Sequence, residues 1–242
     1  MTCMERSAEP TTPSKGTTGS IEPESYSPRQ RILSLAEFAA GAAIVIGHNV
    51  YRIIPNEVPI LFVLAILSFR LRGGRWFIQG LHKPDSWLRV LSYALAAAAI
   101  RILLGSLVID PVTAHFWHAA TAPAGSEQIA GNWAAALRWL GLVWTFAAFG
   151  EEIGYRSYLL TRAAEIGNRS QAAWWAGVLA VSILFGYGHF YKGPSGILDS
   201  SMAGLVLGTA YMLSGRNLWV AILAHGFIDT FGVAALFFGF AS

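Results

Sequence analysis

Three short stretches of the sequence combine carboxylate, guanidinium or imidazole side chains with otherwise apolar surroundings. The first reads Glu-Glu-Ile-Gly-Tyr-Arg over residues 151–156 and follows the apolar run 133–149. The second reads Phe-Gly-Tyr-Gly-His over 185–189, and the third reads His-Gly-Phe-Ile-Asp over 225–229. Charged groups within apolar segments are costly in a bilayer and commonly mark a functional site or a buried ion pair. We therefore expect the three stretches to form one intramembrane catalytic site.

The two adjacent glutamates of the first stretch have different expected roles. Glu152 and Arg156 are four residues apart, so on a helix they share a face and can form an ion pair. Glu151 points about 100° away from Glu152 and is not needed by that pair. Glu151 is therefore the candidate free carboxylate, suited to act as a general base or acid. The alternative is that all three charges form one structural cluster.

The other two stretches repeat the same four-residue spacing. The ring of Phe185 can pack under the imidazole of His189 and limit its rotamers, and Asp229 can orient His225 or stabilise its charge. For His189 the alternative is a structural role at a helix interface. For His225 and Asp229 the alternatives are a proton relay and a hydrogen bond between helices. Arg101, within another apolar run, is expected to line the cavity or to extend toward the membrane surface.

The composition indicates a membrane protein. The 242 residues are 54% hydrophobic and 13% charged, whereas a soluble domain carries about 25% charged residues. The net charge of +3 comes from basic residues that lie mainly between apolar runs, as expected of topology signals rather than of a nucleic-acid surface. The single cysteine, Cys3, leaves no disulfide within the chain and no cysteine-based metal site.

The apolar runs predict an all-α, polytopic membrane bundle of about eight transmembrane or membrane-dipping helices. Residues 1–30 have almost no apolar content and are predicted to be a disordered cytoplasmic tail. Because a spanning helix needs roughly 20 apolar residues, the second and fifth segments are short and are expected to tilt or only to dip into the membrane. The predicted segments are 33–54, 58–71, 87–109, 133–149, 150–166, 172–190, 197–213 and 218–240.

Topology follows from the basic residues. Arg29 and Arg31 precede the first segment, and a cluster that includes Arg72 and Arg75 follows the second, whereas 110–132 contains no Lys or Arg. This bias places the N-terminus in the cytoplasm and the 110–132 loop outside. With eight crossings the 190–196 loop is cytoplasmic, whereas everything after segment 150–166 inverts if that segment does not cross.

We expect a helix break at 149–151. If 133–166 were a single crossing, Glu151 and His189 would lie at opposite faces, roughly 25 Å apart across 17 residues.

The order and placement of the three motifs resemble the CPBP family of intramembrane proteases, which contains CAAX prenyl endopeptidases and bacteriocin-processing or Abi immunity proteins. That family is marked by Glu-Glu-x-x-x-Arg, Phe-x-x-x-His and His-x-x-x-Asn or Asp. The resemblance covers about 133–240, so 31–242 is interpreted as the integral membrane protease domain with its motif-bearing core at 133–240.

The resemblance implies an eight-helix core that hydrolyses a peptide bond in a membrane cavity. Glu151 and His189 would activate water, His225 and Asp229 would hold the oxyanion or complete the site, and Glu152, Arg156 and Phe185 would support it. Asp229 stands where the family often has Asn, and an ionised carboxylate repels an oxyanion. Asp229 is therefore protonated, orients His225 or helps to bind a cation. A metal-free, glutamate-dependent mechanism is preferred, and Zn²⁺ held by the four catalytic side chains is the alternative.

The expected substrate is a membrane-associated peptide or protein, either a prenylated CAAX-type tail or a precursor or leader peptide. The expected partners are the lipid bilayer and this substrate, with no nucleic acid, and the expected location is a bacterial-type plasma membrane. The main rival is a catalytically silent immunity or peptide-binding protein of the same fold. A small proton-coupled transporter is disfavoured, because no paired, broken hydrophobic segments are visible.

Overall fold

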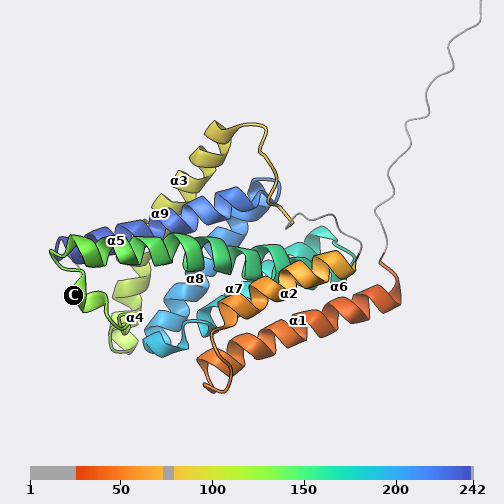
Figure 1. The fold of residues 1–242 in the computed structure, drawn as a ribbon, viewed down its shortest axis with the longest axis horizontal. Helices are drawn as coiled ribbons and strands as arrows, with labels where there is room; N and C mark the ends of the chain where they lie inside the picture. Colours follow the sequence, from red (N-terminus) through yellow and green to blue (C-terminus); the bar gives the residue numbers. More distant parts are fainter. Residues whose placement is uncertain (1–25, 73–78, 241–242) are drawn as a thin grey trace, which may run out of the picture.

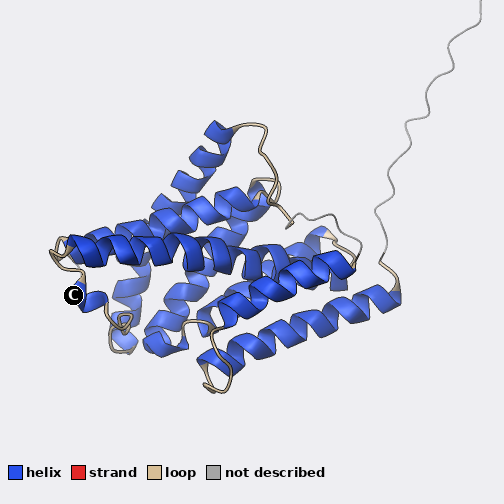
Figure 2. Cartoon of the chain, in the orientation of Figure 1, coloured by secondary structure: helices blue, strands red, loops and turns tan. Residues whose placement is uncertain are grey.

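The computed structural model describes residues 26–72 and 79–240, and in these ranges the chain is helical with no strand (Figures 1 and 2). This confirms the all-α class. The first helices are α1 (Pro28–Asn49) and α2 (Glu57–Leu71). Ser27 caps α1 together with Gln30, so the last residues of the predicted 1–30 tail are helical, whereas 1–25 lie outside the described residues.

Among the remaining helices, the run that begins with α3 and the helix α8 are longer than the sequence predicts. The helix α3 (Trp87–Leu104) continues through a π-helical turn, η1 (Gly105–Ile109), into α4 (Asp110–Phe116). The chain then continues with α7 (Gln171–Tyr187), the 3₁₀ turn η5 (Phe190–Lys192), α8 (Gly193–Leu213) and α9 (Leu218–Phe237).

The predicted break at 149–151 is wrong. One continuous helix, seen as the long green rod in Figure 1, runs from 133 to 166. It comprises α5 (Trp133–Leu142), the π-helical η3 (Val143–Glu151) and η4 (Ile153–Leu159), and α6 (Leu160–Ile166). Predicted segments four and five are therefore one helix, and the eight-segment count is not confirmed.

The glycines at the expected break serve the packing of α2 instead. A Cβ on Gly150 would lie 2.7 Å from Val58, and one on Gly154 would lie 3.1 Å from Leu61. The spacing of four residues puts both glycines on one face, where a second helix can approach closely. In this case the absence of a side chain permits a helix contact rather than a turn.

The argument that a single 133–166 helix would hold Glu151 and His189 roughly 25 Å apart is also wrong. Glu151 lies near the middle of the 133–166 helix, and α7 returns antiparallel beside α6. His189, just beyond the end of α7, therefore lies again at the level of Glu151. The error came from treating Glu151 as a helix terminus.

The connecting loops define two ends of the bundle. The Thr121 amide donates to the Lys192 carbonyl oxygen at 3.2 Å, and the Ser195 hydroxyl donates to the His118 carbonyl oxygen at 2.7 Å. The 110–132 and 190–196 segments therefore lie at the same end, and the prediction that they lie on opposite sides is wrong. The 190–196 segment lies at this end because the two predicted crossings 133–149 and 150–166 are one helix.

A buried polar cluster ties the opposite end together. Arg72 contacts Glu37 at 2.6 Å and Glu165 at 3.0 Å, and Glu165 also pairs with Arg162 and Arg169. Arg72 was expected only as a topology signal, but it also joins α2, α1 and α6. Arg75, from the same predicted cluster, lies outside the described residues.

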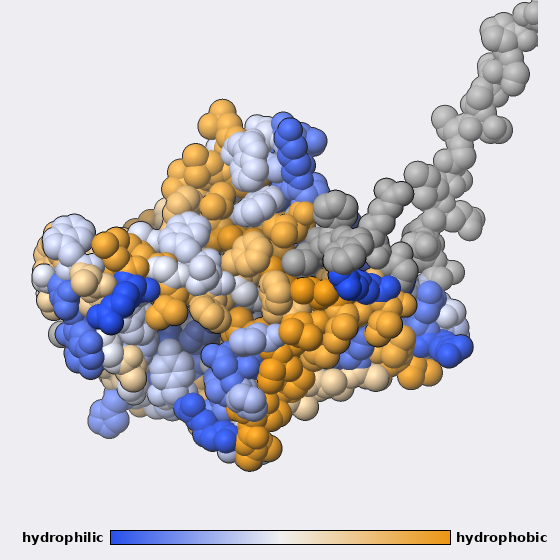
Figure 3. Space-filling model, viewed as in Figure 1, coloured by the Kyte–Doolittle hydropathy of each residue, from blue (hydrophilic) through white to orange (hydrophobic). Residues whose placement is uncertain are grey.

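The protein is an integral membrane protein. Four helical runs in the described part of the chain are long and apolar enough to cross a membrane, namely Pro28–Asn49, Trp87–Phe116, Phe190–Leu213 and Leu218–Phe237. Large hydrophobic side chains such as Leu67, Leu103 and Leu179 are about half exposed. Figure 3 shows hydrophobic residues gathered along α2, as expected for a surface that faces lipid.

Candidate active site

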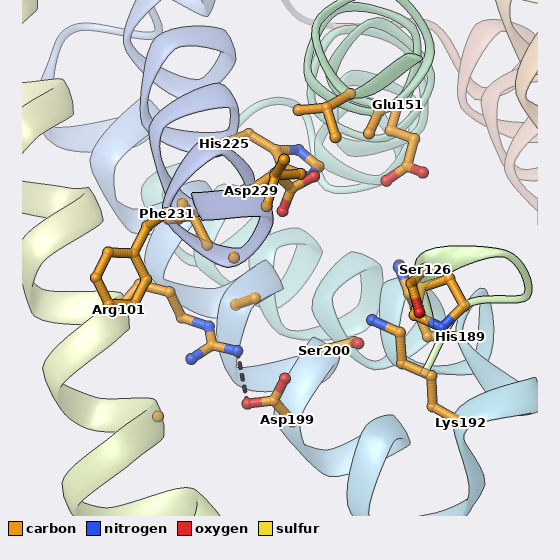
Figure 4. Close-up of a pocket in the computed structure, with 18 of the residues that line it drawn as sticks. Arg101, Ser126, Glu151, His189, Lys192, Asp199, Ser200, His225, Asp229 and Phe231 are labelled. Atoms are coloured by element: carbon orange, nitrogen blue, oxygen red, sulfur yellow. Dashed lines mark hydrogen bonds and ion pairs between the residues drawn. The ribbon is translucent and has the colours of Figure 1, made fainter. Parts of the chain in front are cut away.

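A cavity of about 630 Å³ brings together side chains from all three motifs (Figure 4). Glu151 enters from the end of η3, His189 from the turn after α7, and His225 and Asp229 from successive turns of α9. The structure thus places the four predicted catalytic side chains on the wall of one cavity. Phe185 also lines it.

Glu152 and Arg156 lie behind this wall. The Arg156 Nη1 group donates to Glu152 Oε1 at 2.8 Å, and the two side chains are 0% and 1% exposed. The predicted i, i+4 ion pair is present. Arg156 also donates to the Gly204 carbonyl oxygen of α8 and lies 4.6 Å from the centre of the Phe185 ring.

His225 contacts two carboxylates. Its Nδ1 atom is 2.8 Å from Glu152 Oε1, and its Nε2 atom is 3.5 Å from Asp229 Oδ2. The sequence predicted the Asp229 contact from spacing on α9. It did not predict the contact with Glu152, which depends on how α9 packs against the 133–166 helix.

The packing of α9 on this helix depends on Gly226. A Cβ at this position would lie 2.4 Å from two ring atoms of Trp144. The Trp144 indole also donates to the Thr230 hydroxyl at 3.2 Å. The residue after His225 therefore allows the close helix contact that brings His225 to Glu152.

Glu151 differs from Glu152 in its surroundings. It faces the cavity (Figure 4), whereas Glu152 Oε1 contacts Arg156 and His225 behind the wall. The Oε2 atoms of both glutamates are buried without a hydrogen-bond partner among the described residues, but only that of Glu151 belongs to a side chain that lines the cavity. A buried carboxylate oxygen without a donor is costly unless a ligand or water satisfies it. Glu151 is thus available to bind a reacting molecule.

His189 is oriented by its own helix. Its Nδ1 atom lies 3.0 Å from the Phe185 carbonyl oxygen, which suits a proton on Nδ1 and leaves Nε2 as an acceptor. The Phe185 ring centre lies 4.9 Å from that of His189 and 5.9 Å from that of His225. Phe185 therefore packs between the two imidazoles, in addition to the predicted contact beneath His189.

The cavity also contains charged residues away from the motifs. Arg101, expected on this wall, pairs with Asp199 of α8 at 2.5 Å. Lys192 lines the cavity beside His189, and the sequence interpretation missed both Asp199 and Lys192. Neither residue belongs to a spaced pair, so only the tertiary arrangement identifies them.

The side chains as placed do not form a ready metal site. No group of three or more His, Cys, Asp or Glu side chains suited to one metal ion occurs in the ranges 26–72 and 79–240. Both nitrogens of His225 already face carboxylates.

Comparison with known proteins agrees with this geometry. Residues 133–231 match the family described as type II CAAX prenyl endopeptidase Rce1-like. The matched range contains all three motifs, so this part of the chain resembles a family of peptidases. No curated protein and no solved structure matched the chain.

Proposed function

We propose that the protein is an intramembrane endopeptidase that hydrolyses a peptide bond of a membrane-associated substrate. The observation that carries the proposal is the convergence of Glu151, His189, His225 and Asp229 on one cavity. A site that only binds a peptide would need neither a free carboxylate nor an imidazole beside it. Hydrolysis uses both.

Glu151 and His189 are proposed to hold the attacking water. Glu151 accepts a proton from the water while the oxygen adds to the scissile carbonyl carbon. The tetrahedral intermediate then collapses, the carbon–nitrogen bond breaks, and the proton passes to the leaving amine. The unpartnered Glu151 Oε2 and the acceptor nitrogen of His189 support this assignment.

His225 is proposed to stabilise the oxyanion. With protons on both nitrogens, its ring can donate to Glu152 and toward Asp229 or the oxyanion. The 3.5 Å contact supports an orienting role for Asp229. The positive charge of the ring then offsets the repulsion between Asp229 and the oxyanion.

The test is cleavage of membrane-tethered peptides, both prenylated C-terminal tails and precursor or leader peptides, by the purified protein in liposomes. Glu151→Gln keeps the shape of the side chain but removes the base. We expect it to lower kcat by at least roughly 100-fold, within the range for general base catalysis. Chelation should leave cleavage by the wild type unchanged.

Two outcomes would contradict this mechanism. Loss of cleavage on chelation, with recovery on addition of Zn²⁺, would show a metal-dependent enzyme. If a control protease cuts the panel while this protein cuts nothing and binds peptides equally well with Glu or Gln at 151, the protein is a peptide-binding protein instead.

We further infer that the cavity opens on the side opposite the N-terminus. Cationic residues gather at the end where α1 begins, and the positive-inside rule assigns that end to the cytoplasm. The cavity lies in the other half of the bundle, between the 117–132 loop and the start of α8. At the end where α1 begins, the described cations are Arg29, Arg31, Arg70, Arg72, Lys83, Arg89, Arg162, Arg169 and Arg216. At the other end they are Arg52, Arg138 and Lys192.

Cysteine labelling tests this orientation. Cys3 is the only cysteine in the sequence, so a membrane-impermeant maleimide reports the side of the N-terminus without any substitution. We expect no labelling in spheroplasts and labelling in inside-out vesicles. Ala124→Cys in a Cys3→Ser background, at an exposed loop position, should give the reverse pattern. Labelling of both sites from one side would refute the assignment.

A further inference from the structure

A second, polar cavity lies at the end of the bundle where α1 begins. It has a volume of about 390 Å³ and lies between the start of α3 and the connection from α8 to α9. None of its lining residues belongs to the wall of the cavity that holds the three motifs. Its wall carries the guanidinium of Arg89, the carboxylate of Asp85 and the imidazole of His82. This end of the protein thus has a place of its own for a charged ligand.

The charges of Asp85 and Arg89 are not used by the protein itself. The two residues are four apart, a spacing at which opposite charges within a helix commonly pair. Asp85, however, precedes Ser86, the N-cap of α3, and lies outside the helix. Within residues 26–72 and 79–240, neither side chain forms an ion pair or a hydrogen bond. Separate opposite charges on one cavity wall suit a ligand that itself carries both charges.

The chain that leads into this wall is anchored to the bundle. The Leu218 amide donates to the Gly80 carbonyl oxygen at 2.9 Å, and the Ser157 hydroxyl donates to the Gln79 carbonyl oxygen at 2.8 Å. Gly80 has a φ of 85°, and a Cβ there would lie 2.7 Å from the Arg216 carbonyl oxygen. Only glycine fits this approach without strain. The start of α3 is therefore held against α9 and η4, and the cavity is preformed.

The cavity lies beside residues typical of a membrane surface. The rings of Trp87 and Trp219 contact each other with their centres 5.7 Å apart, and Trp87 is about half exposed. Tryptophan is enriched at the level of the lipid headgroups. Leu213 and Tyr93 in the cavity wall are also exposed, so the polar cavity adjoins apolar surface. A ligand with a charged head and an apolar tail fits both parts.

We propose that this cavity binds the headgroup of a phospholipid that carries a primary ammonium group, such as phosphatidylethanolamine. Arg89 and His82 donate hydrogen bonds to the phosphate, and the ammonium group donates to Asp85. Ser86 and Asn217, the N-caps of α3 and α9, both line the cavity. The positive ends of two helix dipoles therefore add to the attraction for the phosphate. The acyl chains cover the exposed apolar part of the wall.

Other ligands with a phosphate satisfy fewer of these groups. An anionic headgroup without an ammonium group would leave Asp85 unpaired beside a second negative charge. A choline headgroup carries a positive charge but has no N–H group to donate to the carboxylate. Free phosphate would leave both Asp85 and the apolar part of the wall without a partner.

The experiment measures lipid retention by native mass spectrometry of the purified protein released from detergent micelles. Phosphatidylethanolamine competes there with phosphatidylcholine and phosphatidylglycerol of identical acyl chains. A hydrogen bond to a charged group is worth a factor of roughly 10 to 100 in affinity, and we expect the wild type to favour the ethanolamine lipid by this factor. Asp85→Asn should remove the preference, whereas Arg89→Gln should weaken retention of all three lipids. Arg29→Gln is the matched control, because Arg29 is an exposed cation at the same end but outside the cavity.

Equal retention of the ethanolamine and choline lipids by the wild type would overturn the proposal. A preference for phosphatidylglycerol would also overturn it, because the cations alone would then attract the ligand. Displacement of the lipid by equimolar inorganic phosphate or glycerophosphoethanolamine would show a site for a soluble phosphate compound instead. Asp85→Glu and Arg89→Lys keep the charges and should keep the preference. All four variants should unfold at the wild-type temperature without added lipid, since both side chains are exposed and unpaired.

Discussion

Single residues divide the site into a cavity-facing side and a buried side. Glu151 faces the cavity, whereas Glu152 is fully buried between Arg156 and His225. The two glutamates are neighbours in sequence, but only Glu152 is needed to neutralise other buried groups. Substitution of each should therefore affect different properties.

Glu152→Gln should destabilise the protein. It leaves the Arg156 guanidinium without its carboxylate and removes a negative charge from His225. Breaking one partner of a buried pair costs about 3–5 kcal/mol. We expect a lower thermal unfolding temperature in detergent for Glu152→Gln and a nearly unchanged one for Glu151→Gln. Equal stability of the two variants would contradict this division of roles.

The spacing of residues in the sequence was sufficient to predict contacts between side chains of the same helix. The pairs Glu152–Arg156 and His225–Asp229 follow from residues four apart, and both are present in the structure. Contacts between helices could not be read in the same way. The Glu152–His225 contact and the inward position of Lys192 depend on how distant segments pack.

Individual helices position the motifs through close contacts at small residues. Gly186, inside the second motif, faces α8 so closely that a Cβ would lie 2.0 Å from Ser201 Oγ and 2.6 Å from the Ile197 carbonyl oxygen. The backbone oxygen cannot move independently of α8. The separation of α7 from α8 is therefore fixed at the turn before His189.

Gly186→Ala should push α7 away from α8 and displace His189. Overpacking of this kind costs about 1–3 kcal/mol, so we expect both a lower unfolding temperature and slower peptide cleavage. Gly141→Ala is the control, because it also lies in a helix but its Cβ would meet no atom within 4 Å. A Gly186→Ala variant as stable and active as Gly141→Ala would show that α8 adjusts without cost.

The continuity of the 133–166 helix could not be predicted from composition. Gly150 and two adjacent charges have the composition of a helix boundary, and the π-helical geometry of η3 and η4 has no signal in the residue types that we used. Such π segments are rare and occur frequently at functional sites. Here they carry every residue of the first motif except Glu152, which lies between the two segments.

At the scale of the whole molecule, the polar cluster and the cavity occupy opposite halves. Arg72, Glu165 and their partners join the helices at the end where α1 begins, and the cavity opens toward the other. Eight crossings would place Arg162, Arg169 and Arg216 on the side opposite Arg29 and Arg31. With 133–166 as a single helix, these arginines lie at the same end of the bundle.

The length of that helix has a mechanical consequence. At 1.5 Å per residue, residues 133–166 extend about 50 Å, whereas the hydrocarbon core of a bilayer is about 30 Å thick. The helix must tilt strongly, project from the bilayer or thicken it locally, and the balance among these shifts with lipid chain length. Because Glu151 lies near the middle of this helix, tilt changes its depth little, whereas a thicker bilayer increases the distance from the membrane centre to the water phase. The thickness of the surrounding bilayer thus becomes a variable that sets how far the Glu151 carboxylate lies from bulk water.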